Sequence, residues 1–198
     1  MVKADSKPAK RPNVILMLTD DLGYECLGAN GSKTFKTPEL DKLASGGMRF
    51  EQAFVQPLCT PTRAAIMTGK CNARNYIHFG ALEKSQTTFG HLFRDAGYAT
   101  CIVGKWQLGG SIEEETPKHF GFEEHCLYHI PGVPKEGGEN GEYASRYINP
   151  GLAINGKPRK FGNNAYAPNI CSDFVLDYVT RHKDRQFFLY YPMMLTHA

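Results

Sequence analysis

The chain has 198 residues and carries 23 lysines and arginines against 20 aspartates and glutamates, so its net charge is +3 with neutral histidines. Hydrophobic residues make up 41% and charged residues 22%, which is close to globular averages and argues against a disordered chain, a collagen or a coiled coil. Because this charge is small and scattered along the sequence, it gives no case for binding to nucleic acid.

The chain starts with a polar and basic stretch, 1–10, that we expect to be a flexible leader. The longest uninterrupted apolar run, Val14–Leu18, is shorter than the roughly 7–15 residues of the apolar part of a signal peptide, so no signal peptide is visible. It is also far shorter than the roughly 18 residues of a membrane-spanning helix. We therefore expect no membrane as a partner.

The first predicted strand, Asn13–Leu18, is a continuous apolar run of the kind found in a central strand buried on both faces. It ends just before Asp20 and Asp21, so it delivers two carboxylates at its carboxyl end. A capping threonine followed by proline predicts a helix over 37–46. The stretch after this helix, Met48–Val55, is predicted to be a second strand.

The next predicted helix, Thr60–Met67, has threonine as its capping residue and proline at its first position, which places Cys59 just before a helix. The segment 131–160 is rich in glycine, proline, asparagine and charge, so we expect a surface loop insertion with a hairpin near Asn155-Gly156. The remaining predicted elements are helices over 88–96 and 168–182 and strands over 98–103, 120–127 and 186–191.

Strands separated by helices predict an α/β fold with a largely parallel central sheet flanked by helices, in which ligands bind at the carboxyl ends of the strands. Asp20 and Asp21 follow the first predicted strand at that end. Lys105 and His197 follow two later strands, so the topology predicts that all four residues converge. We expect Cys59 to join them, because the N–H groups of a helix N-terminus favour anions.

The chemistry of these groups is open when each is taken alone. Asp20 and Asp21 are hard oxygen ligands suited to Ca²⁺ or Mg²⁺, and the alternative is a solvated turn capped by one aspartate. Cys59 is either a reactive thiol or an inert buried one. The residues that follow Cys59 bear on this choice.

The sequence from Cys59 to Arg63, CTPTR, followed by Thr68-Gly69-Lys70, resembles the sulfatase signature Cys-x-Pro-Ser-Arg with its downstream Thr-Gly-Arg element. Further stretches that resemble the family are 11–13, 19–23, 37–44, 104–106, 166–168 and 197–198. The chain thus resembles the N-terminal part of a sulfatase, within the alkaline-phosphatase-like superfamily. The resemblance implies a truncated alkaline-phosphatase-like α/β domain over 11–198, with its C-terminal part beyond the chain.

In that family a formylglycine-generating maturation enzyme oxidises the signature cysteine, so the resemblance implies that Cys59 is the precursor of a formylglycine. It also implies that Asp20, Asp21 and an oxygen of the modified Cys59 bind Ca²⁺, with Mg²⁺ as the second possibility. Arg63, one helical turn after Cys59, would hold the formylglycine hydrate. The hydrate would attack sulfur and expel the alcohol, and sulfate would then be eliminated from the sulfated enzyme.

By the same resemblance, Lys105 would pair with a sulfate oxygen, and His197 would contact the sulfate and help protonate the leaving oxygen. The structural alternatives are a solvated strand-end charge for Lys105 and an ordinary terminal residue for His197. Gln107 departs from the family pattern, because a histidine is common at this position. Since glutamine does not titrate, Gln107 can hold the geometry but cannot act as the base of the elimination step. The family's remaining metal ligands and its second sulfate-binding lysine would lie beyond residue 198.

The resemblance therefore implies a sulfuric ester hydrolase that acts on an aryl or carbohydrate sulfate. One alternative is a phosphonate or phosphodiester hydrolase of the same superfamily, since sulfate and phosphate esters share their geometry. Another is a catalytically inactive fragment that only binds anions. Family habit favours a periplasmic or secreted protein, although no signal peptide is visible in this chain.

Overall fold

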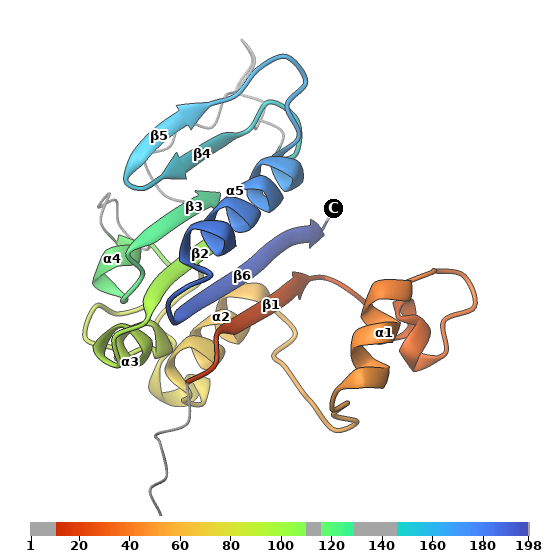
Figure 1. Ribbon diagram of the computed structural model, residues 1–198. Helices are drawn as coiled ribbons and strands as arrows, with labels where there is room; N and C mark the ends of the chain where they lie inside the picture. Colours follow the sequence, from red (N-terminus) through yellow and green to blue (C-terminus); the bar gives the residue numbers. More distant parts are fainter. Residues whose placement is uncertain (1–10, 110–115, 129–145, 198) are drawn as a thin grey trace, which may run out of the picture.

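The computed structural model describes residues 11–109, 116–128 and 146–197. In these ranges six strands form one sheet, in the order β1-β6-β2-β3-β4-β5 (Figure 1). The strands are β1 (Val14–Asp20), β2 (Ala99–Lys105), β3 (Glu124–Tyr128), β4 (Gly151–Ile154), β5 (Lys157–Lys160) and β6 (Phe187–Thr196). The α-helices are α1 (Pro38–Gly46), α2 (Cys59–Thr68), α3 (Phe89–Asp95), α4 (Thr116–His119) and α5 (Ala167–His182).

Four of the strands run in the same direction. β6 pairs in parallel with both β1 and β2, and β2 pairs in parallel with β3, whereas β4 and β5 are antiparallel additions. The predicted α/β fold with a largely parallel sheet is therefore confirmed. Because β1, β6 and β2 are parallel neighbours, their carboxyl ends lie at one edge of the sheet, as ligand sites in such folds require.

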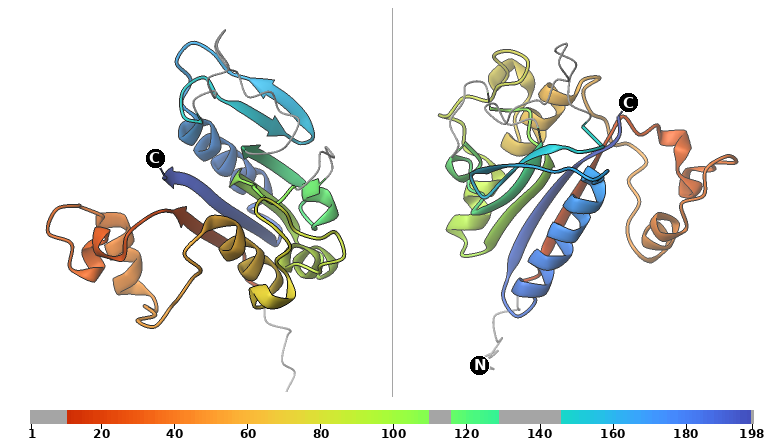
Figure 2. Two further views of the ribbon diagram at one scale, coloured as in Figure 1. Left: turned by 180° about the vertical axis from the view of Figure 1, so that it is seen from behind. Right: turned by 90° about the horizontal axis from the view of Figure 1, so that it is seen from above.

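Helices cover both faces of the sheet (Figure 2). On one face, Met67 of α2 belongs to a buried cluster with Phe188 and Tyr190 of β6, and Phe93 of α3 stacks on Phe188 with ring centroids 3.9 Å apart. On the other face, Tyr178 of α5 belongs to a second buried cluster, which lies between this helix and the sheet. The parallel strands are thus held between two apolar layers, which fixes the position of their carboxyl ends.

Strand β1 is an edge strand in the described part of the sheet, so the prediction that both of its faces are buried is wrong there. Its side chains alternate: Leu16 and Leu18 pack against the core, whereas Ile15 is 51% and Met17 is 54% exposed. Helix α5 lies over β2 and β6 instead, and no described element covers this face of β1. A continuous apolar run predicts a strand, but it does not determine whether other elements cover one face of that strand or both.

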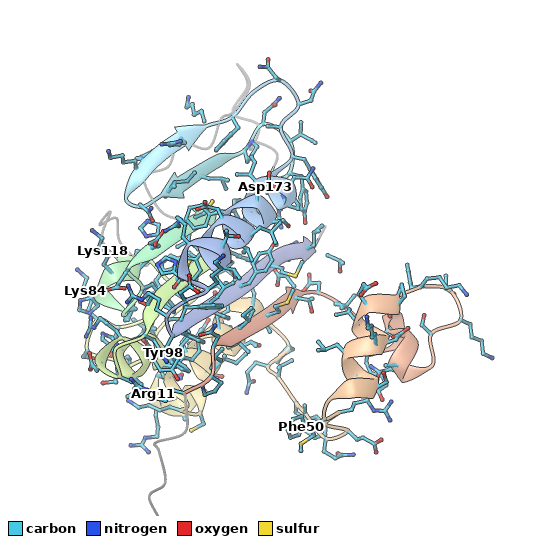
Figure 3. The ribbon with its side chains drawn as sticks, in the orientation of Figure 1. Arg11, Phe50, Lys84, Tyr98, Lys118 and Asp173 are labelled. Atoms are coloured by element: carbon cyan, nitrogen blue, oxygen red, sulfur yellow. The ribbon has the colours of Figure 1, made fainter. Side chains whose placement is uncertain are left out.

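Residues 21–58, which we call the N-terminal lobe, connect β1 to α2 and project away from the sheet (Figure 1). The predicted helix over 37–46 is confirmed as α1. The prediction of a strand over Met48–Val55 is wrong, because this stretch has no neighbouring strand and its large side chains are exposed, among them Phe54 at 86%. Figure 3 shows Phe50 at the lower end of the lobe, apart from Arg11, which precedes β1, and from Tyr98, which precedes β2.

The hairpin predicted near Asn155-Gly156 is confirmed as the turn between β4 and β5, and both turn residues have positive φ angles (48° and 79°), as a tight hairpin turn needs. This hairpin extends the sheet beyond β3, so residues 151–160 are more than a surface loop. Residues 131–145 of the predicted insertion and the predicted leader, 1–10, lie outside the described residues. Within the described ranges, no helix combines the length and the apolar character needed to cross a membrane.

Candidate active site

The centre of the candidate site is a buried ion pair between the last residues of two strands. Asp20 ends β1 and Lys105 ends β2, and these side chains are only 5% and 2% exposed. The Nζ atom of Lys105 donates a hydrogen bond to Oδ2 of Asp20 at 2.6 Å. The two strands are separated by β6, so it is the shared carboxyl edge of the sheet that brings the pair together.

Arg63 of α2 completes this buried cluster from the other side. Its guanidinium is 3.6 Å from Oδ1 of Asp20, and its Nη1 donates to the backbone carbonyl of Lys105 at 3.1 Å. One buried carboxylate therefore faces two buried cations. Removing one partner of such a cluster typically costs about 3–5 kcal/mol, because the remaining charges lose compensation away from water.

Cys59 is the first residue of α2 and lies one helical turn before Arg63, so the prediction that it precedes the helix is wrong by one residue. Its side chain is half-buried. The start of α2 is fixed by Thr62, whose hydroxyl donates to the carbonyl of Leu58 at 2.7 Å. In the described ranges no hydrogen bond joins the Cys59 thiol to Asp20. Arg63, which lies one helical turn after Cys59, is 3.6 Å from Asp20.

Asp21 and His197 form the outer part of the site. Oδ2 of Asp21 is 3.6 Å from Nε2 of His197, and the Asp21 side chain is 65% exposed. The hydroxyl of Thr196 donates to the backbone carbonyl of Asp21 at 3.2 Å, which ties the end of β6 to the end of β1. Asp21 has a φ angle of 56°, so the backbone turns sharply where it leaves the strand. The predicted convergence of the strand-end residues is confirmed, and their chemical roles stay predictions.

Gln107 lies two residues beyond β2, with a φ angle of 53° and a half-buried side chain. Its Oε1 atom is buried and has no hydrogen-bond partner among the described residues. An unpaired buried amide oxygen is costly, so it commonly marks a place where another polar group binds. Gln107 thus places a buried amide oxygen without a described partner two residues after the end of β2.

Three residues near the site did not stand out in the sequence. Arg146 contacts Nδ1 of His197 through its Nη1 atom at 2.6 Å, and the hydroxyl of Tyr147 donates to the carbonyl of Met194 at 3.0 Å. Both come from the segment that was predicted to be an insertion, and no sequence signal connected them to the strand ends. Tyr190 is fully buried beside Arg63, and burial raises the pKa of its hydroxyl to about 12, although the charge of Arg63 acts in the opposite direction.

The donor set suits part of a hard-cation site. Asp20 and Asp21 offer carboxylate oxygens of the kind that Ca²⁺ and Mg²⁺ prefer, at the end of one strand. Ca²⁺ takes roughly 6–8 oxygen ligands, and the described residues hold no group of three or more histidine, cysteine, aspartate or glutamate side chains that could bind a metal. The two aspartates therefore fit such an ion as a partial ligand set.

Comparison with known proteins gives a consistent result along the chain. The family model described as "Sulfatase" matches residues 12–198. Arylsulfatase A of Bos taurus is 33% identical over 214 residues, which cover 96% of this chain and 42% of the relative. Steryl-sulfatase of Homo sapiens is 41% identical over 139 residues, which cover 61% of this chain and 24% of the relative.

A solved structure titled as BT4656 in complex with its substrate D-glucosamine-2-N,6-O-disulfate is similar in fold, with a TM-score of 0.77 and 28% identity. The similarity covers 95% of this chain and 35% of that chain. The chain thus spans less than half the length of each of these three proteins.

Proposed function

Because the chain belongs to the sulfatase family, we propose that the protein hydrolyses a sulfate monoester of an aryl or carbohydrate alcohol. The observation that carries the proposal is the buried cluster of Asp20, Lys105 and Arg63 at the carboxyl edge of the sheet, with Cys59 one helical turn from Arg63. This arrangement gathers positive charge where a sulfate group would lie. The names of the relatives, which include an arylsulfatase and an enzyme in complex with a sulfated sugar, support the substrate class.

The nucleophile in this proposal derives from Cys59, which a formylglycine-generating enzyme converts to formylglycine. When it is hydrated, this aldehyde supplies the hydroxyl group that forms the bond to sulfur. Cys59 lies in the first turn of α2, where backbone N–H groups have no partner within the helix and favour negative charge. Arg63 adds a fixed guanidinium on the same helical face, so it stabilises charge that develops at residue 59.

Asp20 and Asp21 would hold a Ca²⁺ or Mg²⁺ ion together with an oxygen of the modified residue 59. When bound, such an ion offsets the negative charge of the sulfate and increases the acidity of the hydroxyl group next to it. Lys105 donates a hydrogen bond to the carboxylate of Asp20, so its ammonium group is held at the edge of the sheet and can pair with a sulfate oxygen.

His197 is placed to serve the leaving group. Its Nε2 atom faces Asp21 at the outer part of the site, where it can donate a hydrogen bond or a proton to the oxygen of the departing alcohol. Gln107 positions polar groups through its amide and takes no proton, because an amide does not titrate near neutral pH. The elimination of sulfate therefore needs a base other than Gln107.

The experiment compares the full-length protein with two cysteine variants after co-expression with a formylglycine-generating enzyme and addition of Ca²⁺. We expect Cys59→Ala to lower kcat/KM for an aryl sulfate by at least about a thousandfold, since it removes the nucleophile. Cys71→Ala is the matched control, because Cys71 is an exposed free cysteine close to the same helix, and it should retain activity. Turnover of an aryl phosphate or phosphonate in preference to the sulfate, or an active Cys59→Ala variant, would overturn the proposal.

A further inference from the structure

Arg146 makes a direct contact with the imidazole of His197. Its Nη1 atom lies 2.6 Å from Nδ1 of His197, although the two residues are 51 positions apart in the sequence. Arg146 is half-buried and comes from the segment that returns to the sheet just before β4. This segment therefore places a permanent cation behind a residue of the proposed active site.

The chemistry of the contact fixes the roles of the two partners. A guanidinium group has five N–H donors and no acceptor, so Arg146 must donate the hydrogen bond. Nδ1 of His197 must then accept it with a lone pair, which leaves the proton of the neutral imidazole on Nε2. Nε2 is the nitrogen that faces Asp21 at 3.6 Å. The contact thus selects the tautomer that presents a donor to the site.

Two further interactions hold this arrangement in place. The guanidinium of Arg146 lies over the ring of Tyr128, 5.9 Å from its centroid, which favours the cation on that side of the sheet. The neighbouring Tyr147 donates its hydroxyl hydrogen bond to the carbonyl of Met194 at 3.0 Å and also contacts the carbonyl of His197. The backbone and the imidazole of His197 are therefore both held by consecutive residues of one segment.

We propose that Arg146 is a positioning residue that keeps the imidazole of His197 with its proton on Nε2, directed into the site. This inference rests on the proposed function, in which His197 donates to the leaving oxygen. A histidine with its proton on Nδ1 would present a lone pair to that oxygen and could not donate a hydrogen bond to it. Arg146 acts only through His197.

The test combines nitrogen NMR of histidine-labelled full-length protein with kinetics on an aryl sulfate, at about pH 8, where an ordinary histidine is neutral. The His197 signals are assigned by their loss in a His197→Gln variant. Arg146→Met removes the donor and keeps much of the side-chain length, Arg146→Lys keeps a donor, and Arg159→Met is the control. Arg159 is exposed on β5 and has no described contact with the site.

We expect the wild-type protein to show an unprotonated Nδ1 and a protonated Nε2 at His197. Arg146→Met should mix the two tautomers and lower kcat about tenfold with little change in KM, and Arg146→Lys should recover most of both. Equal nitrogen shifts in the wild type and Arg146→Met, or a wild-type proton on Nδ1, would overturn the proposal. If the wild type turned over no sulfate ester but His197 kept this tautomer only when residue 146 carried a donor, the proposed function would fail and the positioning role would stand.

Discussion

The sheet core and the N-terminal lobe are built in different ways. In the core, aromatic side chains such as Phe188, at 1% exposure, pack between the sheet and its helices. In the lobe, Phe54 is 86% exposed, and hydrogen bonds provide much of the order: Oδ1 of Asp41 accepts from the backbone N–H of Ala29 at 2.7 Å and from the hydroxyl of Thr37 at 2.9 Å. Apolar packing therefore holds one region and a local polar network holds the other.

This difference matters because the lobe connects two parts of the candidate site. It begins at Asp21 and ends just before Cys59, and the residues beside both ends are anchored in the core. Asp20 is fixed by its ion pair with Lys105, and Thr62 fixes the start of α2 through Leu58. We infer that the core determines the distance between Asp21 and Cys59, so changes within the lobe should leave the site largely in place.

The largest effect is expected from removing an aromatic ring of the core. Phe188→Ala should lower the free energy of unfolding by about 3–5 kcal/mol, because it empties the space in which Phe188 stacks on Phe93. Phe54→Ala in the lobe is the matched substitution and should change it by no more than about 0.5 kcal/mol. Urea denaturation of both variants measures the contrast, and equal losses would mean that the lobe is packed as tightly as the core.

A second contrast concerns charge. Lys105→Met should lower the free energy of unfolding by about 3 kcal/mol in metal-free buffer, because Asp20 loses its closest cation. We expect the lower end of the usual range since Arg63 still lies 3.6 Å from that carboxylate. Lys33→Met, at an exposed position of the lobe, should be nearly neutral. If the two variants unfolded at the same urea concentration, the buried cluster would not be a distinctive feature of the core.

The third prediction uses pH. Burial lowers the pKa of His125 from 6.5 to about 4, and its Nε2 accepts a hydrogen bond from the N–H of Gly156 at 2.9 Å. The folded state therefore favours the neutral imidazole, so this stabilisation is present above about pH 6.5 and is lost as the pH falls toward 4. Between about pH 7 and pH 5 the contribution to the unfolding free energy should fall by about 2 kcal/mol.

His125→Gln removes the titrating group and isolates this contribution. The difference in unfolding free energy between the wild type and His125→Gln, measured from about pH 7 to pH 5, should shrink as the pH falls. A difference that does not change with pH would show that His125 titrates alike in the folded and unfolded states. His91→Gln is the control, because it makes the same substitution at another histidine, which is half-buried at the start of α3.

The smallest effect is expected on the surface of the core. Arg181 of α5 is 43% exposed and pairs with Asp177 and Glu124, both at 2.7 Å. Because water screens such pairs, Arg181→Met should lower the free energy of unfolding by no more than about 1 kcal/mol, and less at high salt. A loss as large as that of Lys105→Met would contradict the view that burial gives the Asp20 cluster its importance.

The sequence was sufficient to predict that the residues at the strand ends lie close together. The apolar runs before Asp20 and Lys105, separated by helices, predicted a parallel sheet, and the topology rule then brought these residues together. The parallel pairing of β1 and β6 also accounts for the place of His197 beside Asp21. The resemblance to sulfatases, rather than spacing, singled out Cys59.

Other features depend on contacts that a local pattern does not contain. The run Asn13–Leu18 predicts a strand, but its burial depends on which elements lie over it, and Met17 is exposed. Met48–Val55 has apolar residues suited to a strand but no strand to pair with. Arg146 follows a segment without periodicity, so its contact with His197 could be found only from the fold.

The most direct test of the account is the mass of the tryptic peptide Phe50–Arg63, which contains Cys59. It is measured in full-length protein co-expressed with a formylglycine-generating enzyme, alongside turnover of an aryl sulfate. The account predicts that this peptide loses H₂S and gains one oxygen, that Cys71 stays unchanged, and that the rate rises with the converted fraction. Turnover of the aryl sulfate by protein in which Cys59 is still a thiol in every molecule would contradict it.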